Sequence, residues 1–193
     1  SLRRIFQLVR QFRRTSKIPI VLFGYFNPIF HYGVQNFCHA ASRAGADGIL
    51  CLDLPPEESA ELQRWTDAEG LDLIFLLSPT SGLDRVKLVA GKGRGFIYYV
   101  SVTGVTGARQ TLDDQLRSQV ARLRRATSLP VGVGFGISTP WQAAWIAGFA
   151  GAAVVGRALV ERIEKAKGGV EKARRAGAFV FELKRAMKQA VKK

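Results

Sequence analysis

The chain has 193 residues, of which 47% are hydrophobic and 23% are charged, as in folded globular proteins. No run approaches the roughly 20 uncharged apolar residues that a membrane-spanning helix needs. The two cysteines, Cys38 and Cys51, form neither a disulfide framework nor a CxxC pair, and no apolar signal segment is visible. We therefore exclude a disordered chain and a disulfide-rich secreted domain, and we expect a cytoplasmic protein.

The net charge of +14 is concentrated at the two ends of the chain. Residues 1–17 carry +6 and residues 161–193 carry +7, whereas residues 18–160 carry only +1. A basic module that binds nucleic acid or a membrane surface is one alternative. However, aromatic residues are not interleaved with the basic ones, as a base-stacking surface requires. We interpret the basic ends as solvated faces of two amphipathic helices, over Leu2–Arg14 and Val170–Val191.

Short apolar runs alternate with longer segments of helical period, which is the pattern of parallel βα units. The near-continuous hydrophobicity of these runs predicts strands that are buried on both faces. We predict six strands, at Pro19–Gly24, Gly48–Asp53, Leu71–Leu77, Gly95–Ser101, Pro130–Phe135 and Ala152–Gly156. Further helices are predicted at Val34–Ala44, Glu57–Glu69, Leu83–Ala90, Leu112–Thr127, Pro140–Ala147 and Ala158–Lys165.

Six βα units fit either an open doubly wound sheet or part of an eight-stranded (β/α)8 TIM barrel. A complete barrel usually has about 250 residues, so this chain is about two units short. The first predicted helix has no strand before it, so we expect the two missing βα units to precede the N-terminus of this sequence. The chain also opens with Ser1, and its only methionine is Met187. We therefore expect residues 1–193 to be a single incomplete barrel domain from a longer polypeptide.

Glycine-rich segments follow the last three predicted strands, at Gly104–Gly107, Gly134–Ser138 and Gly156–Ala158. In barrels, backbone N–H groups after late strands bind phosphate together with the N-terminus of a short extra helix. Glycine allows the backbone to approach the anion closely. One such glycine is more often an ordinary turn, but three on successive turns favour a phosphate site. A dinucleotide site is excluded, because no segment matches the G-x-G-x-x-G pattern after a strand.

Polar residues close two of the earlier strands. Asp53 ends a strand, where it suits either a functional role at the barrel rim or acceptance of hydrogen bonds from loop N–H groups. Tyr25 and Asn27 follow the first predicted strand, where they suit ligand or partner contact, although Asn-Pro also starts ordinary turns. His31 and His39 have no metal-ligand spacing to Cys, Asp or Glu. We interpret both histidines as structural and predict no metal site.

Four segments together resemble the tryptophan synthase alpha subunit in order and spacing, over nearly the whole chain. They are Tyr25-Phe26-Asn27-Pro28, Asp53-Leu54-Pro55-Pro56-Glu57-Glu58-Ser59, Tyr98-Tyr99-Val100-Ser101 leading into Gly104-Val105-Thr106-Gly107, and Gly134-Phe135-Gly136-Ile137-Ser138. The resemblance implies that the six strands are the third to eighth of a (β/α)8 barrel. It also implies a lyase of tryptophan biosynthesis that cleaves indole-3-glycerol phosphate to indole and glyceraldehyde 3-phosphate by a retro-aldol reaction. Its partner would be a beta subunit in an α2β2 assembly, and pyridoxal phosphate would be bound only by that subunit.

The resemblance also assigns roles to residues of this chain. The phosphate would be bound by Gly107, Gly136, Gly156 and Arg157. The indole cavity would be lined by Phe23, Leu50, Leu52, Leu76, Tyr98, Thr106, Phe135 and Val154. Asp53 would support the active-site loops, and Tyr25 and Asn27 would face the catalytic loop and the partner. The family usually has serine in place of Arg157; the contact there is chiefly through the backbone, so phosphate binding is compatible with arginine, whose guanidinium can add an anion contact.

The catalytic glutamate of the family lies on its second strand, and the catalytic aspartate on the following loop, so both precede the segments matched here. No acidic residue of this chain is therefore assigned a catalytic role. Since a positioned acid–base group contributes typically about 10²- to 10⁴-fold, we predict no measurable indole release by this chain alone. Another phosphate-binding barrel enzyme, such as a sugar-phosphate isomerase, is the remaining alternative; it would share the late glycines but not the segment Asp53–Glu58 in register.

Overall fold

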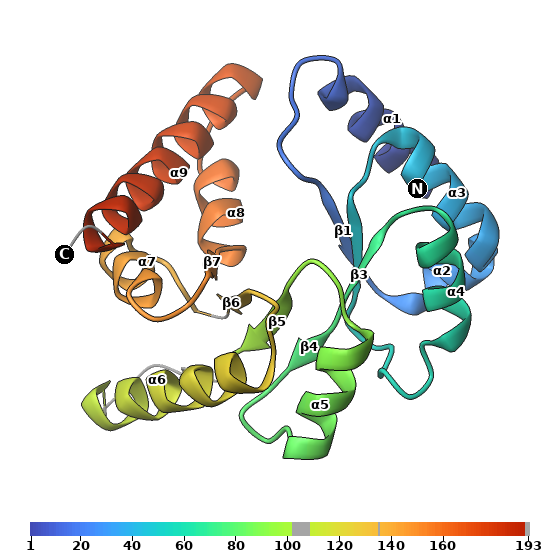
Figure 1. The fold of residues 1–193 in the computed structure, drawn as a ribbon. Coiled ribbons are helices and arrows are strands. Elements are labelled where there is room, and N and C mark those ends of the chain that lie inside the picture. The colour runs from blue at the N-terminus through green and yellow to red at the C-terminus, as the bar shows by residue number, and fades with distance from the viewer. Residues whose placement is uncertain (102–108, 135, 192–193) are drawn as a thin grey trace. The chain divides into compact units, whose positions relative to one another are not determined.

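The computed structural model describes residues 1–101, 109–134 and 136–191, except for the side chains of residues 109–113. Strands and helices alternate along these residues (Figure 1). The strands are β1 (Val21–Gly24), β2 (Gly48–Cys51), β3 (Asp72–Ile74), β4 (Leu76–Leu77), β5 (Ile97–Val100), β6 (Val131–Gly134) and β7 (Ala152–Val154). The helices are α1 (Leu2–Arg13), α2 (Phe26–Tyr32), α3 (Val34–Ala44), α4 (Ala60–Ala68), α5 (Leu83–Lys92), α6 (Arg109–Ala126), α7 (Pro140–Ala147), α8 (Arg157–Glu164) and α9 (Gly169–Val191).

The chain forms two compact units. The first unit contains Ser1–Leu76 and Lys87–Ile97, and the second contains Leu77–Val86 and Tyr98–Lys193. Strands β1, β2 and β3 form one sheet in that order, and β4 to β7 form another in chain order. The pairs β1–β2, β2–β3 and β6–β7 are parallel, which confirms the predicted βα repeat. The prediction of one barrel domain over the whole chain stays a prediction.

Apart from differences of up to three residues at the ends of elements, the predicted elements differ from the observed ones at two places. The predicted strand Leu71–Leu77 is divided into β3 and β4 by Phe75, which belongs to neither strand although its side chain is only 3% exposed. Helix α2 is not among the predicted helices, because its Asn-Pro pair is also an ordinary turn signal. Pro28 is compatible with α2 because it lies in the first turn, where backbone N–H groups have no partner within the helix.

The core of the first unit surrounds the central strand β2, whose four residues are all buried. A strand covered on both faces in this way fits its continuous apolar sequence. Helices α1 and α3 pack through aromatic side chains on one side of this core. The ring of Phe6 lies 5.7 Å from the ring of Phe37 and 5.7 Å from that of Tyr32.

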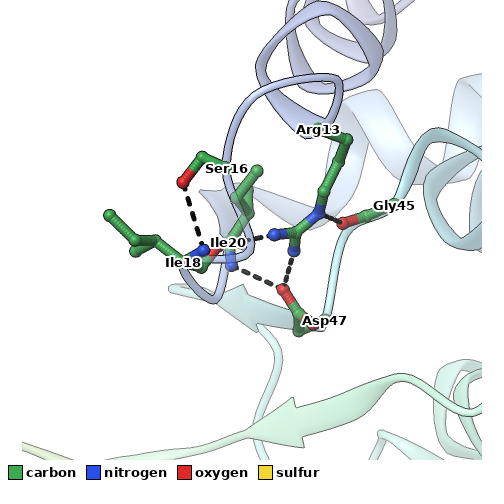
Figure 2. A network of polar contacts seen from close by, with 6 residues as sticks. All are labelled: Arg13, Ser16, Ile18, Ile20, Gly45 and Asp47. Carbon is green, nitrogen blue, oxygen red and sulfur yellow. Dashed lines mark hydrogen bonds and ion pairs between the residues drawn. The ribbon is translucent and has the colours of Figure 1, made fainter.

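A polar network joins the start of β1 to the end of α1 and to the turn before β2 (Figure 2). The Arg13 guanidinium donates through Nε to the Gly45 carbonyl at 2.6 Å, and through Nη1 to the Ile18 carbonyl at 2.6 Å. Its Nη2 forms an ion pair with Asp47, whose Oδ2 also accepts the Ile20 N–H at 2.6 Å. The network therefore fixes the chain where it enters the sheet.

In the second unit, β6 is fully buried and helix α7 packs against α9. Helix α7 begins at Pro140 after a capping box in which Thr139 and Gln142 bond to each other's backbone N–H groups, which explains its predicted start. Helix α9 buries Phe179 and Leu183, and the Arg162 guanidinium carbon lies 3.5 Å from the centre of the Phe179 ring. None of the helices described is long and apolar enough to span a bilayer.

Candidate active site

The carboxyl ends of β6 and β7 bring two of the predicted phosphate-binding glycines to the same edge of the sheet. Gly134 and Val154 are Cα partners in the parallel pairing of these strands. Gly136 and Gly156 each follow their paired residue by two positions, so both lie just beyond this edge. Gly136 has a φ of +80°, a left-handed conformation that favours glycine. Close backbone approach to an anion is therefore possible at both positions.

Helix α8 begins directly at this edge, with Gly156 as its N-cap and Arg157 as its first residue. A Cβ built on Gly156 would meet no atom of the described residues within 4 Å, so the space beside it is open to that extent. The first N–H groups of a helix have no partner within the helix and lie at the positive end of its dipole. The side chain of Arg157 is 93% exposed, and its Nε donates to Glu161 Oε1 at 2.7 Å. This arrangement is suited to an anion.

Tyr98, on β5, lies against the last residue of β6. A Cβ added to Gly134 would lie 2.6 Å from Cζ of Tyr98, so only glycine leaves room for this ring. Burial raises the pKa of the Tyr98 phenol, which keeps it neutral near pH 7. The backbone N–H and the hydroxyl of Ser101 both donate to the Gly134 carbonyl at 3.0 Å. The sequence assigns Tyr98 a role by resemblance; Ser101 ends the same motif but is given no role, because its bond depends on strand pairing.

The predicted indole-lining residues are divided between the two units. Those of the first unit, in order of increasing exposure, are Leu50, Leu76, Leu52 and Phe23. Those of the second unit with a described position are the buried Tyr98 and the half-buried Val154. The remaining predicted site residues, Thr106, Gly107 and Phe135, lie outside the described residues, so their roles stay predictions.

Asp53 anchors the start of helix α2. Its Oδ1 accepts the Phe26 N–H at 2.7 Å and the Cys51 thiol at 3.4 Å. A carboxylate that accepts a helix N-terminal N–H stabilises the helix, so Asp53 has the loop-supporting contact that was one of its two predicted interpretations. Burial, with a contribution from Asp53, raises the pKa of the Cys51 thiol to about 12, which keeps the thiol protonated and unreactive.

A cavity of about 450 Å³ lies at this rim of the first unit. It is lined by Phe26, Asn27, Phe30, Asp53, Leu54, Glu58 and Glu61. Two of the three predicted rim residues, Asn27 and Asp53, belong to this lining, and the third, Tyr25, is 61% exposed. The combination of aromatic rings and carboxylates is suited to a partner that offers apolar and basic groups.

The two histidines contact oxygen atoms of the first unit. His31 Nδ1 lies 2.9 Å from the Asn27 carbonyl within α2, and His39 Nδ1 lies 3.1 Å from Glu69 Oε1. Among the residues that the structure describes, no three His, Cys, Asp or Glu side chains are grouped so that they could hold a metal ion.

Parallel strand pairs in a chain where strands and helices largely alternate, with glycines beyond the last strand ends, place the chain in the βα-repeat class that includes the barrel enzymes. A family model described as tryptophan synthase alpha chain matches residues 1–192. The chain belongs to the tryptophan synthase alpha chain family, a family of lyases. This family membership confirms the predicted enzyme class. It supports neither of the two alternatives, another phosphate-binding barrel enzyme or a basic nucleic-acid-binding module.

Relatives and solved structures agree with this assignment. The chain is 55% identical over 180 residues to the alpha chain of Geobacter sp. strain M21, covering 93% of this chain and 67% of that one. It is 49% identical over 187 residues to that of Geobacter sulfurreducens, covering 97% and 70%. It therefore spans about two thirds of the length of these relatives.

The solved structures extend the agreement to the fold. The alpha subunit of Legionella pneumophila matches with a TM-score of 0.88 at 35% identity, covering 97% of this chain and 70% of that one. A chain of the tryptophan synthase α2β2 complex of Pyrococcus furiosus matches with a TM-score of 0.82 at 36% identity, covering 95% and 73%. These matches confirm the predicted fold class, part of a (β/α)8 barrel.

Proposed function

We propose that this chain takes part, as a portion of a tryptophan synthase alpha subunit, in the retro-aldol cleavage of indole-3-glycerol phosphate to indole and glyceraldehyde 3-phosphate. The family supplies the reaction. The observation that carries the proposal for this chain is the position of Gly136 and Gly156 beyond the paired ends of β6 and β7, where helix α8 begins. Phosphate is the substrate group that this edge is suited to bind.

The chain's contribution is to bind and orient the substrate. The phosphate would accept hydrogen bonds from backbone N–H groups at Gly136, Gly156 and Arg157, and from the predicted Gly107. The positive end of the α8 dipole adds attraction for the anion. Binding energy from this non-reacting group holds the substrate while the bond between the indole ring and the glycerol chain breaks. We assign no catalytic acid or base to residues of this chain.

Apolar side chains would hold the indole ring. In the second unit, Tyr98 and Val154 belong to the strands next to the proposed phosphate site, and the neutral Tyr98 ring offers an aromatic face. The resemblance assigns the rest of the lining to Phe23, Leu50, Leu52, Leu76, Thr106 and Phe135.

We also propose that the rim of the first unit binds a beta subunit, which would carry the pyridoxal phosphate. The support is twofold. The solved relative from Pyrococcus furiosus belongs to an α2β2 complex. The lining of the rim cavity includes Phe30, which is 61% exposed, and Tyr25, which precedes the lining residue Phe26 in the chain, is also 61% exposed.

The test joins the part of the Geobacter sp. strain M21 alpha chain that this chain does not span to the N-terminus of the 193 residues. We expect the joined protein to release indole from indole-3-glycerol phosphate, measured as kcat/KM. Gly136→Ala should lower kcat/KM by about tenfold or more, since it removes a close approach to a charged group. A folded joined protein that releases no indole would contradict the proposal.

The matched control is Gly168→Ala. Gly168 also lies in the second unit with a φ of +80°, and a Cβ there meets none of the described atoms within 4 Å. Both substitutions impose similar backbone strain, so both should lower the melting temperature by similar amounts. Only Gly136→Ala should lower kcat/KM, because Gly168 precedes α9 and follows no strand.

A further inference from the structure

The carbonyl of Gly134, at the end of β6, accepts two hydrogen bonds from one residue. The backbone N–H and the hydroxyl of Ser101, which directly follows β5, both donate to it at 3.0 Å. Ser101 is 2% exposed and Gly134 is also buried, so water does not compete for this carbonyl. The N–H bond continues the pairing of β5 with β6, and the hydroxyl bond is additional. The side chain of Ser101 therefore restrains the strand end beyond what sheet pairing requires.

The first unit contains the same backbone arrangement without a side-chain donor. Gly24 is the last residue of β1, and its carbonyl accepts the N–H of Leu52, which directly follows β2, at 2.9 Å. The side chain of Leu52 is apolar and cannot donate a hydrogen bond. One backbone bond is therefore sufficient to join two neighbouring strand ends in this chain. Sheet pairing does not explain the hydroxyl of Ser101.

The need for a second bond follows from the glycine that Tyr98 imposes at the end of β6. A Cβ on Gly134 would lie 2.6 Å from Cζ of Tyr98, so only glycine fits beside this ring. Glycine restricts its own backbone dihedral angles less than any other residue. The backbone is thus least restrained by sterics at Gly134, only two positions before Gly136. A hydrogen bond that fixes the direction of the Gly134 carbonyl compensates for this freedom.

Ser101 can supply this restraint because β5 is itself firmly held. The first three residues of β5 are buried, and the hydroxyl of Tyr99 donates to Gln119 Oε1 on helix α6 at 2.5 Å. A supporting residue orients its neighbour effectively only when packing and hydrogen bonds fix its own position. The Ser101 hydroxyl therefore connects a fixed strand to a strand end that would otherwise be less restrained.

We propose that Ser101 is a positioning residue for the substrate's phosphate group. The inference rests on the proposed function, in which the N–H of Gly136 binds the phosphate. Ser101 acts through the Gly134 carbonyl and holds the chain where it leaves β6 toward Gly136. A backbone that is ordered before the ligand arrives binds it more tightly, because binding then carries a smaller entropic cost. Ser101 donates to the protein itself and is not a ligand of the phosphate.

The experiment titrates the full 193-residue chain with inorganic phosphate and with glyceraldehyde 3-phosphate, using isothermal titration calorimetry. Unphosphorylated glyceraldehyde is the ligand control. Ser101→Ala should weaken binding of both phosphates by about threefold to tenfold, the effect of one neutral hydrogen bond. Ser101→Cys should weaken it by only about twofold, because the thiol is of similar size and remains a weak donor.

The matched control is Ser59→Ala in the first unit. Ser59 is 0% exposed, and its hydroxyl donates to the backbone carbonyl of Pro56 at 2.9 Å. Each alanine substitution therefore removes one bond between a buried hydroxyl and a backbone carbonyl, and both should lower the melting temperature by similar amounts. Only Ser101→Ala should weaken phosphate binding. An equal loss of affinity in Ser59→Ala would mean that affinity follows stability, which overturns the positioning role.

The titrations also separate this inference from the proposed function. If the parent chain binds neither phosphate, the phosphate site of the proposed function and the role of Ser101 are both overturned. If the parent binds phosphate and Ser101→Ala binds equally well, only the role of Ser101 is overturned. Circular dichroism without ligand establishes that the variants are folded. If Ser101→Ala does not fold, Ser101→Cys decides the question, and binding equal to that of the parent chain overturns the inference.

Discussion

The two units use their strand ends in different ways. In the first unit, carboxylates at strand ends accept hydrogen bonds from the backbone. Asp47 accepts the Ile20 N–H where the chain enters β1, and Asp53 accepts the Phe26 N–H at the start of α2. In the second unit, the ends of β6 and β7 carry glycines, at Gly134, Gly136 and Gly156. The sequence assigns neither carboxylate a catalytic role, and in the structure both accept hydrogen bonds from backbone N–H groups. The glycines leave space for another group, so the binding chemistry is expected there.

The largest expected difference in stability is between alanine substitutions at two glycines that both end a strand. Gly134→Ala should destabilise the second unit by about 2–3 kcal/mol, because its Cβ would overlap the Tyr98 ring. Gly24→Ala in the first unit should leave stability unchanged or raise it by up to about 1 kcal/mol, because none of the atoms that the structure describes lies within 4 Å of its Cβ. Urea denaturation followed by tryptophan fluorescence measures both. Equal destabilisation by the two variants would remove the contrast between the units.

An intermediate effect is expected from the network of the first unit. Asp47→Ala removes the partner of Arg13 and the acceptor of the Ile20 N–H, and should lower the free energy of unfolding by about 1–2 kcal/mol. Labelling of Cys38 and Cys51 offers a local readout, because both thiols are buried in this unit. Labelling should be faster in Asp47→Ala than in the parent chain.

The control for this network is Asp67→Ala. Asp67 pairs with Arg94 at 3.3 Å in the same unit, but both side chains are exposed, at 42% and 62%. Its loss should change the free energy of unfolding by less than about 0.5 kcal/mol. If both variants behave alike, the network is an ordinary surface ion pair and does not fix the entry to the sheet.

The smallest effect concerns the start of α9. Hydrogen bonds from Arg174 and Arg175 lower the pKa of Glu171 from 4.5 to about 2. A carboxyl whose pKa is lowered by folding stabilises the folded state above its unfolded pKa, and this contribution is lost as the pH falls from about 4.5 to about 2. Helicity measured by circular dichroism should therefore show a small loss over this range, absent in Glu171→Gln. An identical pH profile for the variant would contradict this assignment.

Local signals in the sequence were sufficient for several elements. Helix α3 ends as predicted because Gly45 takes the left-handed conformation with a φ of +96°, and α7 begins as predicted at Pro140. The alternation of apolar runs and helical periods was likewise sufficient for the order of the strands. The break at Phe75 was not predictable, because Phe75 continues an apolar run that looks like one strand.

The sequence by itself determined the βα repeat, the family and the glycines beyond the late strands, because periodicity, helix caps and motifs depend on residues close together in the chain. The tertiary structure decided which polar groups meet. Arg13 and Asp47 are 34 positions apart, and Asp53 and Phe26 are 27 apart. The same is true of Gly136 and Gly156, which reach one edge through the register of β6 and β7. Hydrogen bonds and ion pairs act over a few ångströms, so only the folded backbone determines which distant residues form them.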